Sequence, residues 1–92
     1  MQVPVELKRK YLDRRIEDLQ KLRSTVNEGD YTWAIRLGHQ VKGNALTFDF
    51  PQMTSLGVAI EAAGKNEDKD SIINLIEEME SAIFTAQQKF IS

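Results

Sequence analysis

Apolar residues recur at steps of three and four along most of the chain, the spacing that places side chains on one face of an α-helix. The first stripe follows Pro4, which suits an early helical position, and ends before Gly29, which favours a helix stop. It consists of Leu12, Ile16, Leu19, Leu22 and Val26. This pattern predicts a long first helix with one apolar face.

A second stripe predicts a helix that begins after Asp30, a residue type that caps helix N-termini. Its apolar positions are Ala34, Leu37, Val41, Ala45 and Phe48. The pattern breaks at residues 49–51, because Pro51 disfavours helical geometry at the residue before it. We therefore expect the second helix to extend to about Phe48.

Two more stripes predict a third and a fourth helix. The third contains Met53, Leu56, Ile60 and Ala63, and Gly64 stands where a left-handed C-cap is expected. After the polar turn 65–68, with Asp68 or Asp70 as cap, the fourth contains Ile72, Leu75, Ile76, Met79, Ile83, Ala86 and Phe90. Because the connections are short, residues 1–92 are expected to form a single all-α domain, an antiparallel up-down four-helix bundle.

Composition argues against several classes of function. The 92 residues carry a net charge of −2, which does not suggest nucleic-acid binding. Without cysteine there is no disulfide framework or thiolate site, and the presence of a single histidine argues against a metal centre. No stretch approaches the length of a membrane span or a signal peptide. We expect a cytoplasmic monomer without a cofactor and without nucleic-acid or membrane partners.

His39 is the only histidine, and it lies between Gly38 and Gly43 in a predicted helix, where each glycine costs about 1 kcal/mol relative to alanine. On a wheel of about 100° per residue, the apolar stripe lies almost opposite His39, so its imidazole is expected to face outward. Gly43 falls directly above the ring and leaves a gap there. Gly38 turns toward the core and is expected to serve packing.

The neighbours of His39 on the wheel combine charge with apolar surface. Arg36 and Lys42 flank the ring, and Ile35 and Leu46 lie on the same outward face. Neutral imidazole is a nucleophile near physiological pH, and a phosphoryl group added to it is an anion that Lys42 can neutralise. The same pattern also fits a surface histidine among solvated cations, and the wheel does not decide between the two interpretations.

Glu61 is the candidate partner of His39. The turn between the second and third helices is centred near Phe50, eleven residues after His39 and eleven before Glu61. Positions equally far from a hairpin turn lie level, so a Glu61 carboxylate that turns toward the second helix accepts a bond from one ring N–H. That bond fixes the tautomer and leaves the other nitrogen free to attack. A surface carboxylate without this contact is the alternative.

These residues resemble the motif of the histidine-containing phosphotransfer (HPt) family, in which the histidine precedes an apolar residue, a lysine and a glycine, followed by small and apolar residues and a patterned helix. The matching positions are His39, Val41, Lys42, Gly43, Ala45, Phe48, Met53, Leu56, Ile60 and Glu61, about the central third of the chain. The departure is Asp49, where the family usually has glycine. That position suggests a left-handed turn, which aspartate tolerates.

The resemblance implies a phosphocarrier rather than an enzyme. His39 corresponds to the phosphorylated residue, Lys42 to a phosphate-stabilising neighbour, Gly43 to the gap that admits the partner, and Glu61 to the polar residue bonded to the histidine. The implied partners are a histidine kinase or hybrid kinase and a response-regulator receiver domain, whose aspartate exchanges the phosphoryl group and which supplies Mg²⁺.

Two other functions stay open. One is a helical docking module that is not phosphorylated, and the other is the first domain of a chemotaxis-type histidine kinase. The sequence contains no P-loop and no kinase glycine-rich loop, so ATP binding by this chain is not expected.

Overall fold

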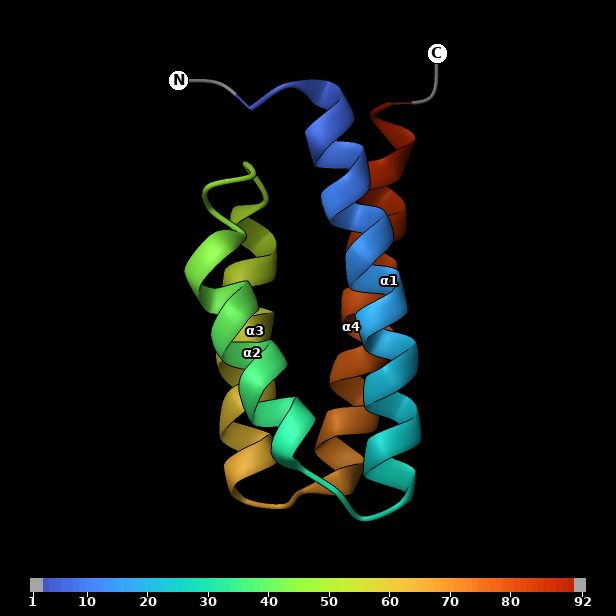
Figure 1. Ribbon diagram of the computed structural model, residues 1–92, viewed down its shortest axis with the longest axis vertical. Coiled ribbons are helices and arrows are strands. Elements are labelled where there is room, and N and C mark those ends of the chain that lie inside the picture. The colour runs from blue at the N-terminus through green and yellow to red at the C-terminus, as the bar shows by residue number, and fades with distance from the viewer. Residues whose placement is uncertain (1–2, 91–92) are drawn as a thin grey trace.

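The computed structural model describes residues 3–90, in which every regular element is an α-helix. α1 spans Val5–Asn27, α2 Thr32–Asn44, α3 Pro51–Lys65 and α4 Lys69–Gln88. Consecutive helices run in opposite directions along the long axis (Figure 1), and each packs against two others. The prediction of four helices is confirmed over this range. Residues 1, 2, 91 and 92 of the predicted domain lie outside it.

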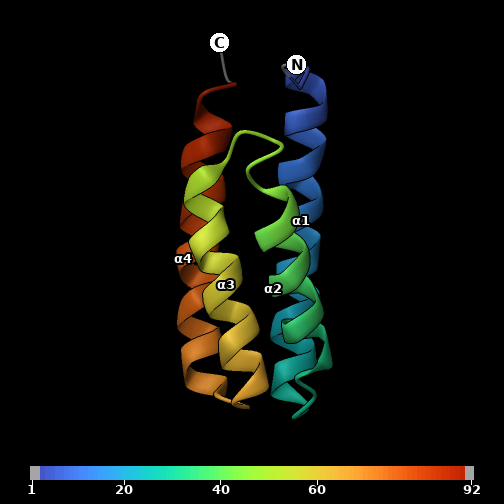
Figure 2. The same ribbon diagram turned by 90° about the vertical axis from the view of Figure 1, so that its left-hand side faces the viewer.

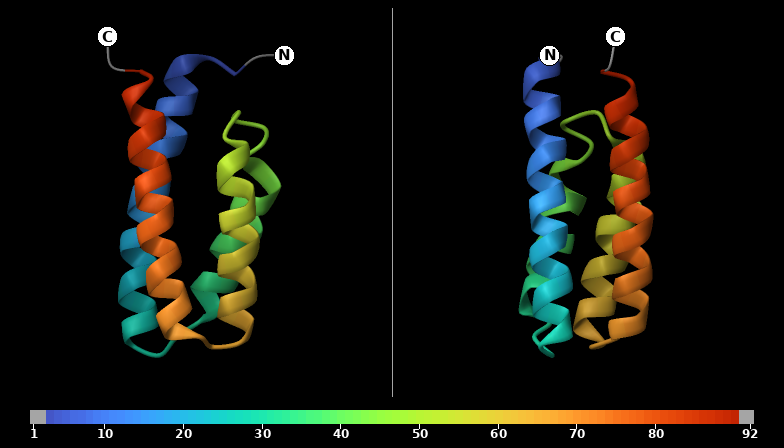
Figure 3. Two further views of the ribbon diagram at one scale, coloured as in Figure 1. Left: turned by 180° about the vertical axis from the view of Figure 1, so that it is seen from behind. Right: turned by 90° about the vertical axis from the view of Figure 1, so that its right-hand side faces the viewer.

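The α2–α3 hairpin is shorter than the pair formed by α1 and α4. Figures 2 and 3 show the ends of α1 and α4 extending past the turn that joins α2 to α3. α2 and α3 therefore lie side by side along one side of the molecule. The histidine on α2 and the candidate carboxylate on α3 belong to this hairpin.

The core is built from the predicted apolar stripes. Its largest fully buried side chains are Leu12, Leu19, Leu22, Val26, Leu37, Val41, Met53, Ile60, Ile72, Ile76, Met79 and Ile83. Burial of a side chain of this size contributes about 1.5–3 kcal/mol. Five predicted core positions are only partly buried and pack against this cluster: Ile16, Phe48, Leu56, Leu75 and Phe90.

Glycines allow the backbones of α2 and α3 to touch. A Cβ on Gly38 would stand 2.4 Å from the backbone nitrogen of Glu61 and 2.6 Å from the carbonyl oxygen of Gly57. A Cβ on Gly57 would stand 2.8 Å from the backbone nitrogen of Lys42. Because these distances are far inside van der Waals contact, only glycine permits this helix spacing. The expectation that Gly38 serves packing is confirmed.

The predicted left-handed cap at Gly64 is wrong. α3 continues to Lys65, and Gly64 is buried where a Cβ would stand 2.9 Å from that of Ala34. The left-handed residue of this turn is Glu67, with a φ of 51°. Close helix packing and a left-handed turn both select glycine, so the residue type alone does not separate the two roles.

The expected cap at Asp30 is misplaced by one residue, because α2 begins at Thr32 and its N-cap is Tyr31. The Asp30 carboxylate still accepts a hydrogen bond from the Thr32 N–H at 3.0 Å. At α4 the cap is Asp68, which accepts from the N–H and the hydroxyl of Ser71. These hydrogen bonds lower the pKa of the Asp68 carboxyl, and the bond from the hydroxyl has the larger effect.

α2 ends at Asn44, so the prediction that it reaches Phe48 is wrong. Phe48 instead lies in the turn that follows, half-buried against α1. Its ring centroid is 4.4 Å from that of Tyr11, and the Phe50 ring is 5.8 Å from Tyr11 on the same side. The Tyr11 hydroxyl also donates a hydrogen bond to Asn44 Oδ1 at 2.6 Å. These contacts with α1 therefore stabilise a turn after Asn44, where the sequence pattern predicted that α2 continues.

Asp49 has a φ of 70°, the left-handed conformation that its position suggested. Aspartate tolerates this conformation better than most residues because its short polar side chain bonds locally. Here the carboxylate is 3.3 Å from Lys8 Nζ on α1. The aspartate thus keeps the turn and adds an ion pair to the first helix.

We expect Gly38→Ala to destabilise the protein by roughly 1–3 kcal/mol, the usual cost of overpacking a core, although alanine is the better helix former. For a chain of this length, each kcal/mol lowers the Tm by about 4–8 °C. Gly43→Ala is the matched control, because no atom lies within 4 Å of the Cβ it would add. Its stability should be unchanged or up to about 1 kcal/mol higher. Thermal and denaturant melts of both variants measure the difference, and equal stability would contradict the close backbone contact.

Candidate functional site

His39 lies in the middle of α2 on the side away from the core. Its side chain is 69% exposed, whereas Leu37 and Val41, two positions away in each direction, are fully buried. The outward direction expected from the helical wheel is therefore observed. The imidazole is therefore accessible from solvent without any opening of the bundle.

The surface next to His39 is open at Gly43. This glycine is exposed, and a Cβ built on it would meet no atom within 4 Å apart from its chain neighbours and the backbone of its own helix. It lies one turn beyond His39 on the same face of α2. The helix thus presents a ring with free space beside it, as the sequence predicted.

Glu61 of α3 reaches across the helix contact to His39. Its Oε2 lies 3.3 Å from His39 Nδ1, and its side chain is only 13% exposed. The close approach at Gly38 produces this arrangement, because that glycine touches the backbone nitrogen of Glu61 itself. The level placement of the two residues on either side of the turn is confirmed.

Two lysines complete the surroundings of the Glu61 carboxylate. Lys42 Nζ donates a hydrogen bond to Oε1 at 3.1 Å, and Lys65 Nζ lies 3.8 Å from Oε2. The hydrogen bond from Lys42, followed by the charges of Lys42, Lys65 and His39, lowers the pKa of Glu61 despite its partial desolvation. The carboxylate is therefore ionised at neutral pH and faces three nitrogens.

This arrangement gives the two ring nitrogens of His39 different roles. A carboxylate near Nδ1 favours the tautomer that carries its proton there, since that N–H points toward a negative charge. The lone pair of the neutral ring is then on Nε2. An exposed imidazole with this tautomer is a nucleophile at Nε2.

The three predicted partner-binding residues differ in exposure. Arg36 is exposed and has no ion pair within residues 3–90, and Leu46 is 67% exposed in the turn after α2. Ile35 is only partly exposed, because its Cγ1 lies 3.0 Å from the position of a Cβ on Gly64. The apolar surface that the wheel assigned to Ile35 is therefore partly covered by α3.

The sequence interpretation missed three residues of this region. Lys65 was assigned to a polar turn, although its spacing of four from Glu61 is that of a helical ion pair. Gly57 was not considered, although a glycine inside an apolar helix signals close packing. Val58 is an exposed apolar side chain on α3, one turn before Glu61, and it extends the apolar surface of the site.

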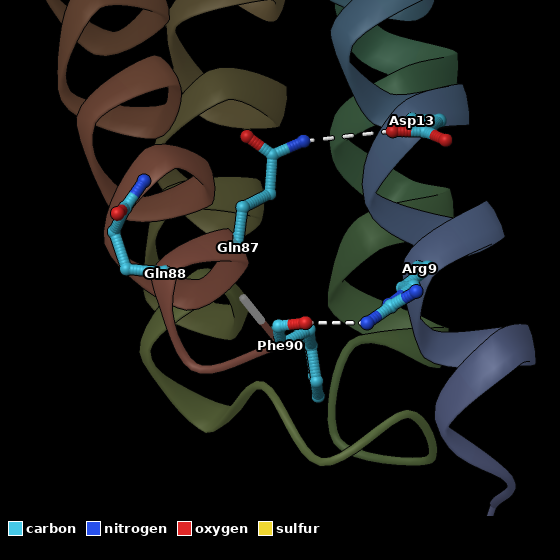
Figure 4. Close-up of a pocket in the computed structure, with 5 residues that line it drawn as sticks. All are labelled: Arg9, Asp13, Gln87, Gln88 and Phe90. Atoms are coloured by element: carbon cyan, nitrogen blue, oxygen red, sulfur yellow. Dashed lines mark hydrogen bonds between the residues drawn. The ribbon is translucent and has the colours of Figure 1, made fainter. Parts of the chain in front are cut away.

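A hollow of about 340 Å³ lies elsewhere, between α1 and α4 (Figure 4). In it the Gln87 amide donates to Asp13 and the Arg9 guanidinium donates to the Phe90 carbonyl, so these polar groups satisfy one another. Within residues 3–90, no cluster of three or more histidine or acidic side chains is arranged to hold a metal ion. Over the same range, no helix has both the length and the apolar character needed to cross a membrane.

We expect Lys42→Ala to raise the pKa of Glu61 toward the ordinary value of a glutamate, because the largest cause of its lowering is removed. The stabilisation from this pair is present at neutral pH and is lost as the pH falls through the pKa of Glu61. The variant should therefore lose less stability on acidification than the parent. A carbon-13 NMR titration of the Glu61 carboxyl measures the shift, with Lys69→Ala as control, and an unchanged pKa would contradict the hydrogen bond.

The comparisons with known proteins agree with this geometry. The family model of the Hpt domain matches residues 6–88. No curated protein and no solved structure matches the chain. Hpt domains are phosphocarriers of two-component systems, in which they interact with kinases and receiver domains. The match covers nearly all of the four helices, and the chain belongs to the Hpt domain family.

Proposed function

We propose that the chain is a phosphorelay intermediate that carries a phosphoryl group on Nε2 of His39. In the forward step, the Nε2 lone pair attacks the phosphorus of a receiver aspartyl phosphate. A P–N bond forms, the P–O bond to the aspartate breaks, and the aspartate leaves as a carboxylate. The reverse step returns the phosphoryl group to a receiver aspartate.

One observation carries this proposal: the exposed ring of His39 has Nδ1 held 3.3 Å from Glu61 Oε2 while the surface at Gly43 stays open. A histidine that only contributes to solubility needs neither a nearly buried carboxylate partner nor a vacant helical position beside it. The pairing orients the ring for attack by Nε2. The vacancy provides room for the protein that carries the acceptor aspartate.

Lys42 supplies the neighbouring cation in this proposal. It lies one turn beyond His39, and its Nζ donates a hydrogen bond at 3.1 Å to Oε1 of Glu61, the carboxylate that lies beside His39. A phosphoryl group on the ring is an anion, and a charge-assisted hydrogen bond from an ammonium stabilises it. Arg36 and Leu46 are proposed to contact the partner, with Ile35 contributing its exposed part.

The partner is proposed to supply most of the catalysis. A receiver domain brings the aspartate and the Mg²⁺, and a histidine kinase or hybrid kinase is the donor, so the chain itself needs no cofactor. We also propose that the chain acts as a monomer, because it would meet its two partners one after the other through the same face. We place this exchange in the cytoplasm, where the sequence led us to expect the protein.

The first test asks whether His39 is the phosphoacceptor. His39→Gln should show the parent's helicity and melting temperature, because the ring is exposed, but should carry no acid-labile, base-stable label. Incubation with a panel of phosphorylated receiver domains, followed by detection of label on the chain, measures this. Label that persists on the variant would refute the assignment, and a parent chain that no receiver labels would favour the docking module.

The second test separates stability from docking at Gly43. Gly43→Gln should melt at the parent's temperature or slightly above, because the new side chain points into open space. The same side chain occupies the space proposed for the receiver, so transfer should slow by at least tenfold, roughly 1.4 kcal/mol of transition-state contact. Gly43→Ala should transfer at a rate between those of the parent and Gly43→Gln. A melt paired with a transfer time course measures both effects, and normal transfer by Gly43→Gln would show that the gap is not a docking feature.

A further inference from the structure

The Glu61 carboxylate, whose Oε2 lies 3.3 Å from His39 Nδ1, also lies close to two lysines. Lys42 is already bonded to Oε1 at 3.1 Å, and Lys65 stands nearby at 3.8 Å from Oε2 without a bond. Within residues 3–90, neither lysine has another carboxylate within ion-pair distance. Two lysines thus lie beside one carboxylate: Lys42 forms a hydrogen bond with Glu61, and Lys65 lies near it without one.

Phosphorylation of His39 would place a second anion beside the same lysines. The phosphoryl group and Glu61 then compete for Lys42, because an ammonium that turns to the phosphoryl group leaves Oε1. Glu61 is 13% exposed, so water replaces the lost cation poorly. A partly buried carboxylate that loses its hydrogen-bonded cation is destabilised, and here it would also lie next to the new negative charge.

Lys65 is placed to remove this conflict. Its side chain is 63% exposed and belongs to the last residue of α3, and a displacement of about 1 Å brings Nζ from its present distance to hydrogen-bond range of Oε2. We propose that Lys65 is a positioning residue that takes over Glu61 when Lys42 turns to the phosphoryl group. This inference rests on the proposed phosphorylation of His39.

The exchange also bears on how long the phosphoryl group stays on the ring. In hydrolysis, water attacks the phosphorus and the P–N bond breaks with its electron pair on Nε2, so that the imidazole is the leaving group. The water oxygen becomes part of inorganic phosphate, and its protons pass to the phosphate or to solvent. The ring is the better leaving group when Nδ1 carries a proton, because it then departs as neutral imidazole and not as an imidazolate anion. A Glu61 carboxylate without a lysine favours the protonated ring through Nδ1, whereas Lys65 on Glu61 weakens that effect. Lys65 therefore prolongs the life of the phosphohistidine.

The experiment uses the whole chain and no partner protein. Phosphoramidate, a small phosphoryl donor, labels the parent and its variants, and phosphorus-31 NMR follows the loss of phosphohistidine. Lys65→Gln should shorten the lifetime about threefold, the factor that an exposed ion pair typically contributes. Lys65→Arg should restore most of it. Lys69→Gln is the matched control, because it removes the same charge from an exposed lysine at the start of α4 that has no partner within residues 3–90.

A double substitution distinguishes the exchange from a general effect of charge. When Glu61→Gln has removed the carboxylate that Lys65 is proposed to bind, Lys65→Gln should leave the lifetime unchanged. An effect of equal size in both backgrounds, or an effect of Lys69→Gln as large as that of Lys65→Gln, would overturn the proposal. So would equal lifetimes of the parent and Lys65→Gln.

Failure of this inference is separable from failure of the proposed function. If His39→Gln still accepts phosphoryl from phosphoramidate at the parent's level, the phosphoacceptor assignment itself fails. If label requires His39 but its lifetime does not depend on Lys65, only the role of Lys65 fails. Thermal melts of the single lysine variants should coincide with that of the parent within a few degrees, because each substituted lysine is exposed.

Discussion

The backbone contact between α2 and α3 is the constraint on which the rest of the site depends. Gly38 lies directly against the backbone of Glu61, and Gly57 lies against that of Lys42. Each glycine weakens its own helix by about 1 kcal/mol, and the close packing between the helices offsets that cost. A wider spacing would move the Glu61 carboxylate out of reach of His39. The two glycines that weaken the helices therefore set the distance on which the ring's tautomer depends.

Beside that contact, the Glu61 carboxylate lies within 4 Å of three side-chain nitrogens, those of His39, Lys42 and Lys65. Glu61 is nearly buried, so its interactions with His39 and Lys42 are less screened by water than those of an ordinary surface pair. The reacting ring nevertheless remains exposed. A phosphocarrier needs this combination, because the group that orients the ring must be fixed while the ring itself stays accessible to successive partners.

The first helix supports the site from behind. The Tyr11 ring packs against that of Phe48, the Tyr11 hydroxyl donates a hydrogen bond to Asn44, and Lys8 forms an ion pair with Asp49. The turn after α2 is therefore in contact with α1 at several points. Leu46 belongs to this turn and is its exposed apolar side chain. The α2–α3 hairpin thus presents Leu46 in a position that α1 determines, although α1 contributes no group to the chemistry.

The sequence by itself determined the four helices, their buried faces and the outward direction of His39, because these follow from local periodicity on a 3.6-residue turn. Hairpin symmetry was sufficient to place Glu61 level with His39. Only the tertiary structure decided what each glycine does: Gly64 packs against Ala34 instead of capping α3, since both roles select the same residue. It also ended α2 at Asn44, because Phe48 packs on Tyr11 in a turn. The partial covering of Ile35 by α3 likewise depends on how two helices are spaced, and periodicity along one helix does not contain that spacing. The spacing of four between Glu61 and Lys65 was readable from the sequence, but the direction in which the lysine side chain extends was not.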